Sequence, residues 1–280
     1  MRRPRTRLRH PLREKGSKLG APSCCRLSPS KEDDDGRPSP SNDNLWPVCR
    51  SSIDVFISPE AMVLLVARHI WHEAQERELG WWSGFQDKLT SVDFVERKRL
   101  EILQIWANVR RFVDTSVPRV LEIGAGGHAF VNFIPEAYCV GLEPLIFEMK
   151  RNGIGVFLPS ARFVTGVGEH LPFRDNEFDV VFSYNVLDHT SDPRSGLDEI
   201  IRVLRRGGIL HLYVDTYSLA FKLYRAFYRS DRMHPHTFTA HEIHRWLSRR
   251  GLRVVRDVSN ERRVGRRRHR VVQVFCSRER

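Results

Sequence analysis

The stretch VLEIGAGGHAF, residues 120–130, is an apolar run that ends in glycines and holds an acid, Glu122. A short apolar run bounded by glycines is typical of a β-strand and the turn after it. Gly124 and Gly126 also permit backbone conformations with positive φ, and they let a ligand come close to the main chain. The stretch therefore predicts a strand followed by either a plain turn or a cofactor-binding loop.

Outward from this stretch, short apolar runs alternate with helical periodicity. Further strands are expected at 138–142, 178–183, 209–214, 252–256 and 271–275. A helix is expected over 195–204, ending in the basic and glycine-rich residues 205–208. This order predicts an α/β fold with a doubly wound, Rossmann-like and mostly parallel sheet. The last two strands have no helix between them, so we expect an antiparallel terminal hairpin with the Arg-rich residues 261–270 in its loop.

Composition divides the chain into three parts. Residues 1–52 are rich in Arg, Ser, Pro and Asp, and we expect a disordered basic and polar tail, unless translation starts nearer Met62. Residues 53–113 are expected to form an N-terminal helical cap, and 114–280 the ligand-binding domain. Two helices of the cap flank the sequence GWWSGFQDKL, residues 80–89, whose aromatic side chains are expected to close over the ligand.

Charge is unevenly distributed in this chain of 280 residues with net charge +12. Residues 1–30 carry nine basic side chains and one acidic, and residues 225–280 carry sixteen basic and five acidic. The part between them is mildly acidic, so we do not expect the whole domain to bind nucleic acid. The loop 261–270 either tracks phosphates or is a solvated surface loop.

The cysteines, the amino end and the longest apolar runs bear on the cellular compartment of the protein. The chain has five cysteines without C-x-x-C spacing, which indicates neither a zinc framework nor a set of disulfides. The amino end is basic but lacks the apolar segment of a secretory signal, and no apolar run is long enough to span a membrane. We therefore expect a cytoplasmic protein without a transmembrane segment.

Two acids stand at the ends of the first two predicted strands. Glu122 precedes the glycines, where its charge would repel a pyrophosphate and attract an ammonium group. Glu143 follows the second strand about 20 residues after Gly124, the position from which an acid accepts hydrogen bonds from ribose hydroxyls. Together they favour a nucleoside ligand that carries a positive charge.

Five motifs in order resemble the class I, type 11 methyltransferases that depend on S-adenosylmethionine. They are LEIGAGGH, GLEP, G-x-G-E-x-L-P-F, F-D-V-V-x-S-x-N-V-L-D-H and E-I-x-R-V-L-x-x-G-G, and they span residues 119–214. The resemblance implies a seven-stranded sheet and S-adenosylmethionine as the methyl donor. It also implies that Gly124 and Gly126 approach the methionine part, that Glu122 holds its ammonium group and that Glu143 takes the ribose hydroxyls.

The sequence departs from this family at the adenine. The family commonly has an Asp where this chain has Val167, so adenine recognition is expected from backbone near Gly168, together with Glu169 or an apolar wall. Asn185 follows the strand at 178–183 and is expected beside the donor. His128 stands where a nucleotide-binding loop often has a third glycine, and we expect it to begin the next helix.

Histidines are the candidate catalytic residues on the acceptor side. His189, His234 and His236 are expected to act as a general base if the acceptor must lose a proton. Some quinone-pathway relatives carry Glu-x-x-Glu-His and a metal ion here, but Asn185 replaces the first acid, so no metal is expected. His241 and His244 are expected on a helix that starts near Thr237.

Three functions remain open at this point. The first is methyl transfer to a small-molecule or metabolite acceptor by in-line displacement, in which positioning does most of the work. The second is modification of RNA guided by the basic ends. The third is a cofactor-binding protein without turnover. A fold of this kind hosts many substrates, and the acceptor does not follow from the sequence.

Overall fold

A computed structural model describes residues 59–228, 233–264 and 267–279. The predicted tail at 1–52 lies outside these residues. Within them, no helix combines the length and the apolarity needed to cross a membrane.

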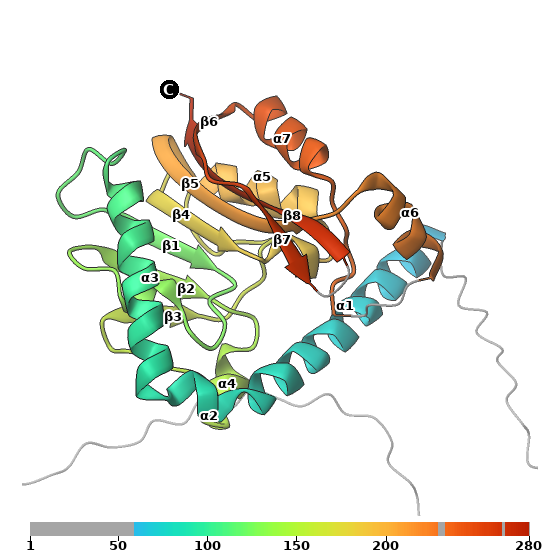
Figure 1. Ribbon diagram of the computed structural model, residues 1–280, viewed down its shortest axis with the longest axis horizontal. Coiled ribbons are helices and arrows are strands. Elements are labelled where there is room, and N and C mark those ends of the chain that lie inside the picture. The colour runs from blue at the N-terminus through green and yellow to red at the C-terminus, as the bar shows by residue number, and fades with distance from the viewer. Residues whose placement is uncertain (1–58, 229–232, 265–266, 280) are drawn as a thin grey trace, which may run out of the picture. The chain divides into compact units, whose positions relative to one another are not determined.

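One mixed sheet forms the centre of the described chain (Figure 1). Its strands are β1 Arg119–Ile123, β2 Tyr138–Leu142, β3 Ala161–Val164, β4 Phe178–Tyr184, β5 Leu204–Thr216, β6 Leu252–Asp257, β7 Asn260–Val264 and β8 Arg267–Arg278. Seven of them follow the order β3-β2-β1-β4-β5-β8-β6, and β7 pairs with β8 outside this path. The strands from β3 to β5 are parallel, and β8 runs antiparallel to β5 and β6. The predicted doubly wound sheet with an antiparallel terminal hairpin is confirmed.

Both faces of the sheet are buried, which explains the nearly continuous apolar runs in its central strands. On one face Leu121, Val181 and Leu212 pack with residues of α5, Pro193–Val203, and α7, Ala240–Arg249. On the other face Val120 and Phe182 pack with residues of α3, Val92–Arg110. Because side chains alternate along a strand, neighbouring residues feed opposite cores.

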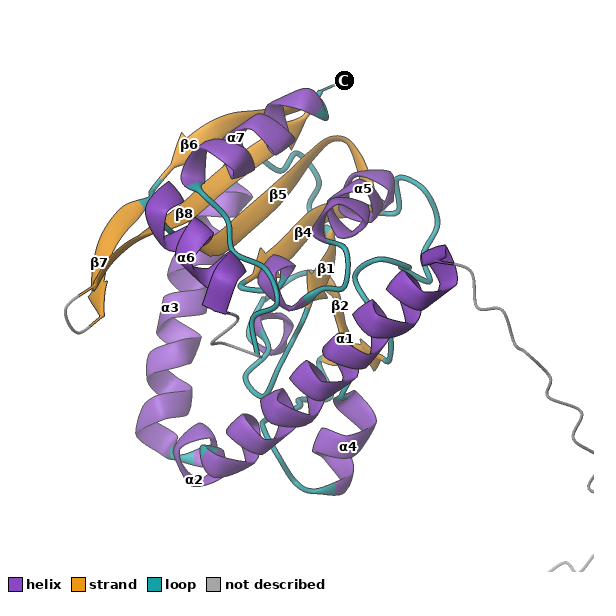
Figure 2. Cartoon of the chain, turned by 90° about the vertical axis from the view of Figure 1, so that its right-hand side faces the viewer, coloured by secondary structure: helices purple, strands orange, loops and turns teal. Residues whose placement is uncertain are grey.

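The N-terminal helices end on a third, smaller core. Helix α1 spans Pro59–Gly84, α2 Gln86–Thr90 and α4 Ile146–Arg151. Trp82, Leu89, Met149 and Ile154 are buried together between these elements. Helix α1 lies on the side of the sheet toward which β1 and β4 point, close to α4 (Figures 1 and 2).

Sequence did not predict the length of α1, which continues through the glycines of GWWSG instead of ending before them. Gly80 is exposed and a side chain there would meet nothing within 4 Å, so its neighbours do not constrain it. Burial of Trp82 in the third core outweighs the low helix propensity of glycine, which is about 1 kcal/mol per residue.

Two boundaries also differ from the prediction. Helix α5 ends at Val203, and residues 205–208 belong to β5 instead of a helical last turn. Arg205 forms ion pairs with Asp114 and Asp179, which hold this segment along the sheet. Residues 261–270 are not a loop: their described part forms β7 and the start of β8, paired from Asn260↔Val271 to Val264↔Arg267.

Helices α6, Leu219–Tyr228, and α7 follow β5. Helix α7 starts with a capping box, in which the Thr239 hydroxyl accepts from the Glu242 N–H and the Glu242 carboxylate accepts from the Thr239 N–H. The predicted helix start and the positions of His241 and His244 on that helix are therefore confirmed.

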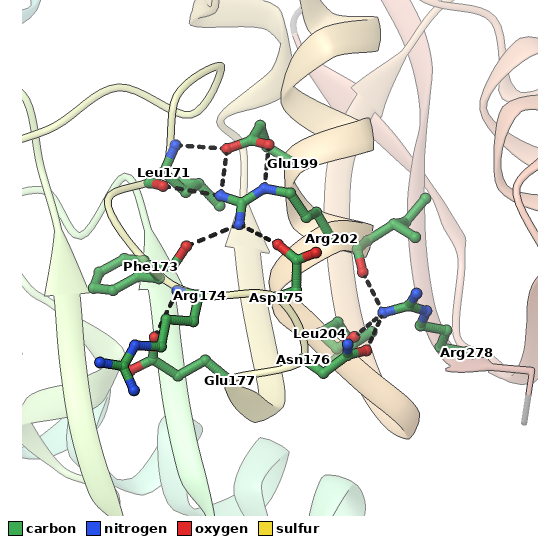
Figure 3. Close-up of polar contacts among 11 residues, drawn as sticks. Leu171, Phe173, Arg174, Asp175, Asn176, Glu177, Glu199, Arg202, Leu204 and Arg278 are labelled. Carbon is green, nitrogen blue, oxygen red and sulfur yellow. Dashed lines mark hydrogen bonds and ion pairs between the residues drawn. The ribbon is translucent and has the colours of Figure 1, made fainter.

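The segment between β3 and β4 is fixed by one arginine of α5 (Figure 3). The Arg202 guanidinium donates to the carbonyls of Leu171 and Phe173 and pairs with Glu199 and Asp175. Glu199 in turn accepts from the Leu171 N–H at 2.8 Å. These contacts link the L-P-F segment to the helix behind it, and they set the position of residues 167–169, which lie at the functional site.

Candidate functional site

The carboxyl ends of the parallel strands meet at one edge, where the strand order reverses between β1 and β4. Gly124 follows β1, Glu143 follows β2 and Asn185 follows β4. All three line one cavity of about 380 Å³. This is where ligands bind in open α/β sheets, and the volume is in the range of ligand pockets.

The loop after β1 depends on both of its glycines. Gly124 has φ of +68° and Gly126 of +55°, a region that other residues rarely adopt. A Cβ on Gly124 would lie 2.5 Å from the Val186 side chain, and one on Gly126 would lie 2.7 Å from the Trp82 ring. The amides of Gly124 and Ala125 both donate to the Leu142 carbonyl, which ties the loop to β2.

Glu143 closes the loop from the β2 side. One carboxylate oxygen accepts from the Gly126 N–H at 2.9 Å and the other from the Leu145 N–H at 3.0 Å. Burial raises the pKa of this carboxyl to about 7, despite the two hydrogen bonds. Glu143 is thus a buried acid at a cavity wall, with its charge only partly compensated by the protein.

Glu122 is the second buried acid of the cavity. It accepts a hydrogen bond from the Val131 N–H at 3.1 Å. Burial raises its pKa to about 8, and the nearby charge of Glu143 adds to the rise. Two acids with raised pKa values in one cavity form a site that a cationic ligand would stabilise.

Helix α1 supplies one wall of the cavity, and the sequence analysis predicted only some of its residues. Trp71, Gln75, Glu78 and Trp82 line the cavity, as does Trp81. The first four are spaced by four, three and four residues, so they share one face of the helix. This spacing could have identified Trp71, Gln75 and Glu78, but the sequence analysis named only the aromatic residues of 80–89. Phe85, the third aromatic residue expected there, is exposed and packs on Trp81 at 4.6 Å between ring centroids.

His128 does not begin a helix, which corrects the sequence prediction. It forms a bridge with Val156, and the next element is a single 3₁₀ turn, Phe130–Asn132. Its ring packs edge-on against Trp82 and Phe94. Burial lowers its pKa to about 4, so at neutral pH it is an uncharged packing residue under α1.

Gly168 and Glu169 are two further predicted residues, and Val167 stands next to them in the chain. Val167, Gly168 and Glu169 all line the cavity. One oxygen of Glu169 accepts from the N–H and hydroxyl of Ser191 and from the Asp192 N–H, so this carboxylate holds the loop after β4. A side chain on Gly168 would make only ordinary contacts, so the backbone there is not crowded.

Asn185 is held in an unusual conformation. Its φ is +56°, and its N–H donates to the Tyr213 carbonyl at 2.8 Å. Its amide oxygen is buried and has no hydrogen-bond partner among the described residues. A buried polar atom of this kind costs free energy unless a ligand or water satisfies it.

His189 and His234 both line the cavity and lie next to each other. Their ring centroids are 4.5 Å apart, and Nδ1 of His189 lies 3.6 Å from a carboxylate oxygen of Glu78. Asp188 is buried beside them, and burial raises its pKa to about 6. Donor atoms of Asp188, His189 and His234 all lie within 4.8 Å of one another. This arrangement suits proton transfer, and it is also compact enough for one metal ion, which the sequence did not predict.

His236 is separated from this pair. It lines a second cavity of about 830 Å³, together with residues of α6 and α7. Its backbone N–H donates to the Asp188 carbonyl at 3.3 Å, and burial lowers the pKa of its ring. Trp71 and Thr190 line both cavities, so the two spaces are neighbours.

Comparison with known proteins agrees with this geometry. Residues 121–212 match the methyltransferase domain family. An uncharacterized methyltransferase of Bacillus subtilis, YcgJ, is 34% identical over 105 residues, which cover 36% of this chain and 41% of that protein. A probable tRNA methyltransferase 9B of Mus musculus is 27% identical over 166 residues, 56% of this chain and 32% of that protein. The chain thus spans less than half the length of these curated relatives.

A solved structure shows the same fold. The crystal structure of the Bacillus YcgJ protein aligns with a TM-score of 0.52 and 16% identity, and it covers 64% of this chain and 98% of that one. At this identity the likeness concerns the fold alone.

Proposed function

Because residues 121–212 form a methyltransferase domain of the class I, type 11 family, whose methyl donor is S-adenosylmethionine, we propose that this protein methylates a small-molecule or metabolite acceptor. One observation carries the donor assignment: two glycines with positive φ and two buried acids converge on one cavity. The five cysteines show no C-x-x-C spacing, and this supports the cytoplasmic location that we propose.

The residues present fit this donor. S-adenosylmethionine, when bound, supplies an electrophilic methyl group on a positively charged sulfur. Glu143 would accept hydrogen bonds from the ribose hydroxyls at the positions its loop contacts leave free, and Glu122 would hold the ammonium group. Asn185 would accept a hydrogen bond from the methyl donor through its unsatisfied amide oxygen. Val167, Val186 and the backbone of Gly168 provide an apolar wall for the adenine, in place of the usual acid.

His189 and His234 are the proposed acid–base residues for the acceptor. Either imidazole would take the proton that leaves an acceptor O–H or N–H when the new bond to carbon forms. The Glu78 carboxylate near His189, and the buried Asp188, would stabilise the imidazolium that results. His236, which belongs to the second cavity, is proposed to contact the acceptor instead of the reacting atoms.

The test has a binding arm and a turnover arm. Calorimetry with S-adenosylhomocysteine measures the donor site, and a labelled methyl donor with fractionated acceptor extracts measures turnover. We expect His234→Ala to lower turnover by about two to four orders of magnitude and to leave cofactor affinity nearly unchanged. His241→Ala, an exposed histidine on α7, is the control. Full turnover by both His189→Ala and His234→Ala would leave positioning alone to explain the rate.

RNA modification is the second candidate, favoured by the basic ends and by the likeness to the mouse protein. Binding to RNA should weaken steeply as salt is added, because phosphate contacts release counterions. Methyl transfer to RNA with such a salt dependence would overturn the small-molecule proposal. Cofactor binding without turnover on any acceptor would support a binding protein instead.

A further inference from the structure

A third cavity, of about 790 Å³, lies at the opposite edge of the sheet from the donor cavity. Arg205 and Arg206, which line it, stand at the start of β5, whereas the donor cavity lies beyond the carboxyl ends of β1, β2 and β4. Ile209 of β5 and Arg253 of β6 both stand opposite Ser277 of β8, so these three lining side chains share one face of the sheet. It is the face on which α3 packs, because Ile209 belongs to that core.

Arginines dominate the lining of this third cavity, which we call the arginine cavity. Five arginines against two acids give its lining a net charge of +3. The arginines are Arg111, Arg205, Arg206, Arg253 and Arg278, and the acids are Asp114 and Glu279. The donor cavity is the opposite case, since four glutamates line it and no Lys or Arg of the described chain does. The two edges of the sheet therefore attract ligands of opposite charge, and the arginine cavity attracts anions.

Most of these arginine charges are not neutralised by the protein. Arg205 is paired, because it contacts Asp114 and Asp179. The side chains of Arg111, Arg206 and Arg253 are exposed, and within 59–228, 233–264 and 267–279 they form no ion pair and no hydrogen bond. Three guanidinium groups from three different elements thus stand around one cavity without an acid to balance them.

Arg278 gives the arginine cavity a guanidinium whose orientation is fixed. Its Nη1 donates to the Asn176 side chain and to the carbonyls of Ile201 and Leu204, which are all neutral groups (Figure 3). Its Nε and Nη2 have no partner among the described residues, so part of the donor fork stays available. Burial lowers the pKa of Arg278, and the like charge of nearby Arg206 lowers it further. An anion beside both groups would relieve this repulsion.

We propose that the arginine cavity binds a small phosphorylated ligand. A net charge of +3 suits a group with two or more negative charges, such as a phosphate monoester or a pyrophosphate, whereas a single carboxylate would leave most of that charge unbalanced. Guanidinium groups match phosphate oxygens with paired N–H donors. The volume is in the range of small-ligand pockets, which favours a compound that enters the cavity over a chain that follows the surface.

The experiment is a calorimetric titration of the full chain with pyrophosphate, inorganic phosphate and acetate. We expect pyrophosphate to bind most tightly, phosphate more weakly and acetate not at all, with affinities that fall as salt screens the charges. Arg206→Ala with Arg253→Ala should weaken pyrophosphate binding at least about tenfold, because two charge-assisted contacts are lost together. Addition of S-adenosylhomocysteine should leave the pyrophosphate affinity unchanged, since the donor cavity lies at the other edge of the sheet.

The matched control is Arg245→Ala with Arg249→Ala, which removes two exposed arginines of α7 that line none of the three cavities. It removes the same charge from the chain, and it should bind pyrophosphate like the unchanged protein. Melting temperature and S-adenosylhomocysteine affinity should stay the same in both double variants, because none of the four residues lines the donor cavity. These two readouts separate loss of the anion site from misfolding and from failure of the proposed function.

Four outcomes would overturn the proposal. They are no binding of pyrophosphate, equal binding of acetate, unchanged binding in Arg206→Ala with Arg253→Ala, and an equal loss in the control variant. Titration with a single-stranded RNA oligonucleotide provides a further decision. RNA that binds more tightly than pyrophosphate, and that the same double variant no longer binds, would assign the arginine cavity to a nucleic acid and overturn its assignment to a small ligand.

Discussion

Glu122 and Glu143 illustrate how a residue type at a strand end becomes a site. Each follows from the strand pattern, and each is buried where the strand order reverses. Burial is the main cause of both raised pKa values, and the charge of Glu143 adds to it at Glu122 and that of Glu78 at Glu143. A ligand with a positive charge and hydroxyl groups would let both acids ionise and keep their hydrogen bonds.

The first prediction concerns Glu143. Glu143→Ala should weaken S-adenosylhomocysteine binding by about 2 to 4 kcal/mol, because charge-assisted hydrogen bonds to the ligand are lost together. Calorimetry measures the change. Glu76→Ala, an exposed acid on α1, is the control. An unchanged affinity would remove Glu143 from the donor site.

The second prediction concerns pH. Between pH 6.5 and 8, Glu122 and Glu143 still hold protons in the folded chain that the unfolded chain has lost, because their folded pKa values are about 8 and 7. The folded state then binds more protons, so the free energy of unfolding falls with rising pH, by about 1.4 kcal/mol per unit for each retained proton.

His128, His211 and His236 have pKa values lowered by burial, so they act in the opposite direction, mainly below about pH 7. Melting of the ligand-free protein from pH 7 to 8 therefore reports mainly on the two acids, because Asp188, with a pKa of about 6, is by then largely ionised in the folded chain. Glu122→Gln should flatten the decline. A decline as steep in this variant as in the unchanged chain would contradict the assignment.

At the scale of residues, the sequence predicted those acids and glycines whose positions follow from a strand and its turn. It did not predict Gln75 or Glu78 as cavity residues. Their position depends on how α1 packs against the loops, and a helical period alone does not say which face meets a ligand. His236 shows the converse, since proximity in sequence to His234 did not place both in one cavity.

Among elements, α1 and the glycine loop form a coupled pair. The Trp82 ring occupies the space that a Cβ on Gly126 would need. The helix and the loop therefore restrict one another, and neither can change shape alone.

The third prediction tests this coupling. Gly126→Ala should destabilise the protein, both because φ is positive and because Trp82 is displaced. The loss should be smaller in a Trp82→Ala background, with a coupling energy of about 0.5 to 3 kcal/mol. Chemical unfolding of the two single variants and the double variant measures it. Additive losses would show that the ring and the loop are independent.

Element boundaries were predicted least well where tertiary contacts decide them. The shift of residues 205–208 into β5 depends on the ion pairs of Arg205 with two distant acids. The pairing of 260–264 with β8 depends on the strand already fixed against β5. Local signals such as Arg-Arg-Gly-Gly cannot report contacts of this kind.

For the whole molecule, the fourth prediction concerns the tail. Deletion of residues 1–52 should leave the melting temperature and the cofactor affinity unchanged, because a polar segment of this composition contributes no packing. Calorimetry on the shortened chain tests both quantities. A large drop in either would show that the tail is ordered against the rest of the protein.

The fold as a whole was the most predictable level, since alternating strands and helices leave few arrangements. The acceptor was the least predictable. The space proposed for it lies among α1, the loop after β4 and the segment after β5, which are far apart in sequence.

Part of the cavity lies within the sequence that matches the methyltransferase family, and part lies outside it. The glycine loop and both acids lie within the segment common to the methyltransferase family, whereas α1 and His234 lie outside it. Under the roles proposed above, substitutions at His234, or on α1 away from Trp82, would alter which acceptor is accepted and leave the glycine loop unchanged. On these proposed roles, relatives could differ in acceptor while they share the donor half of the site.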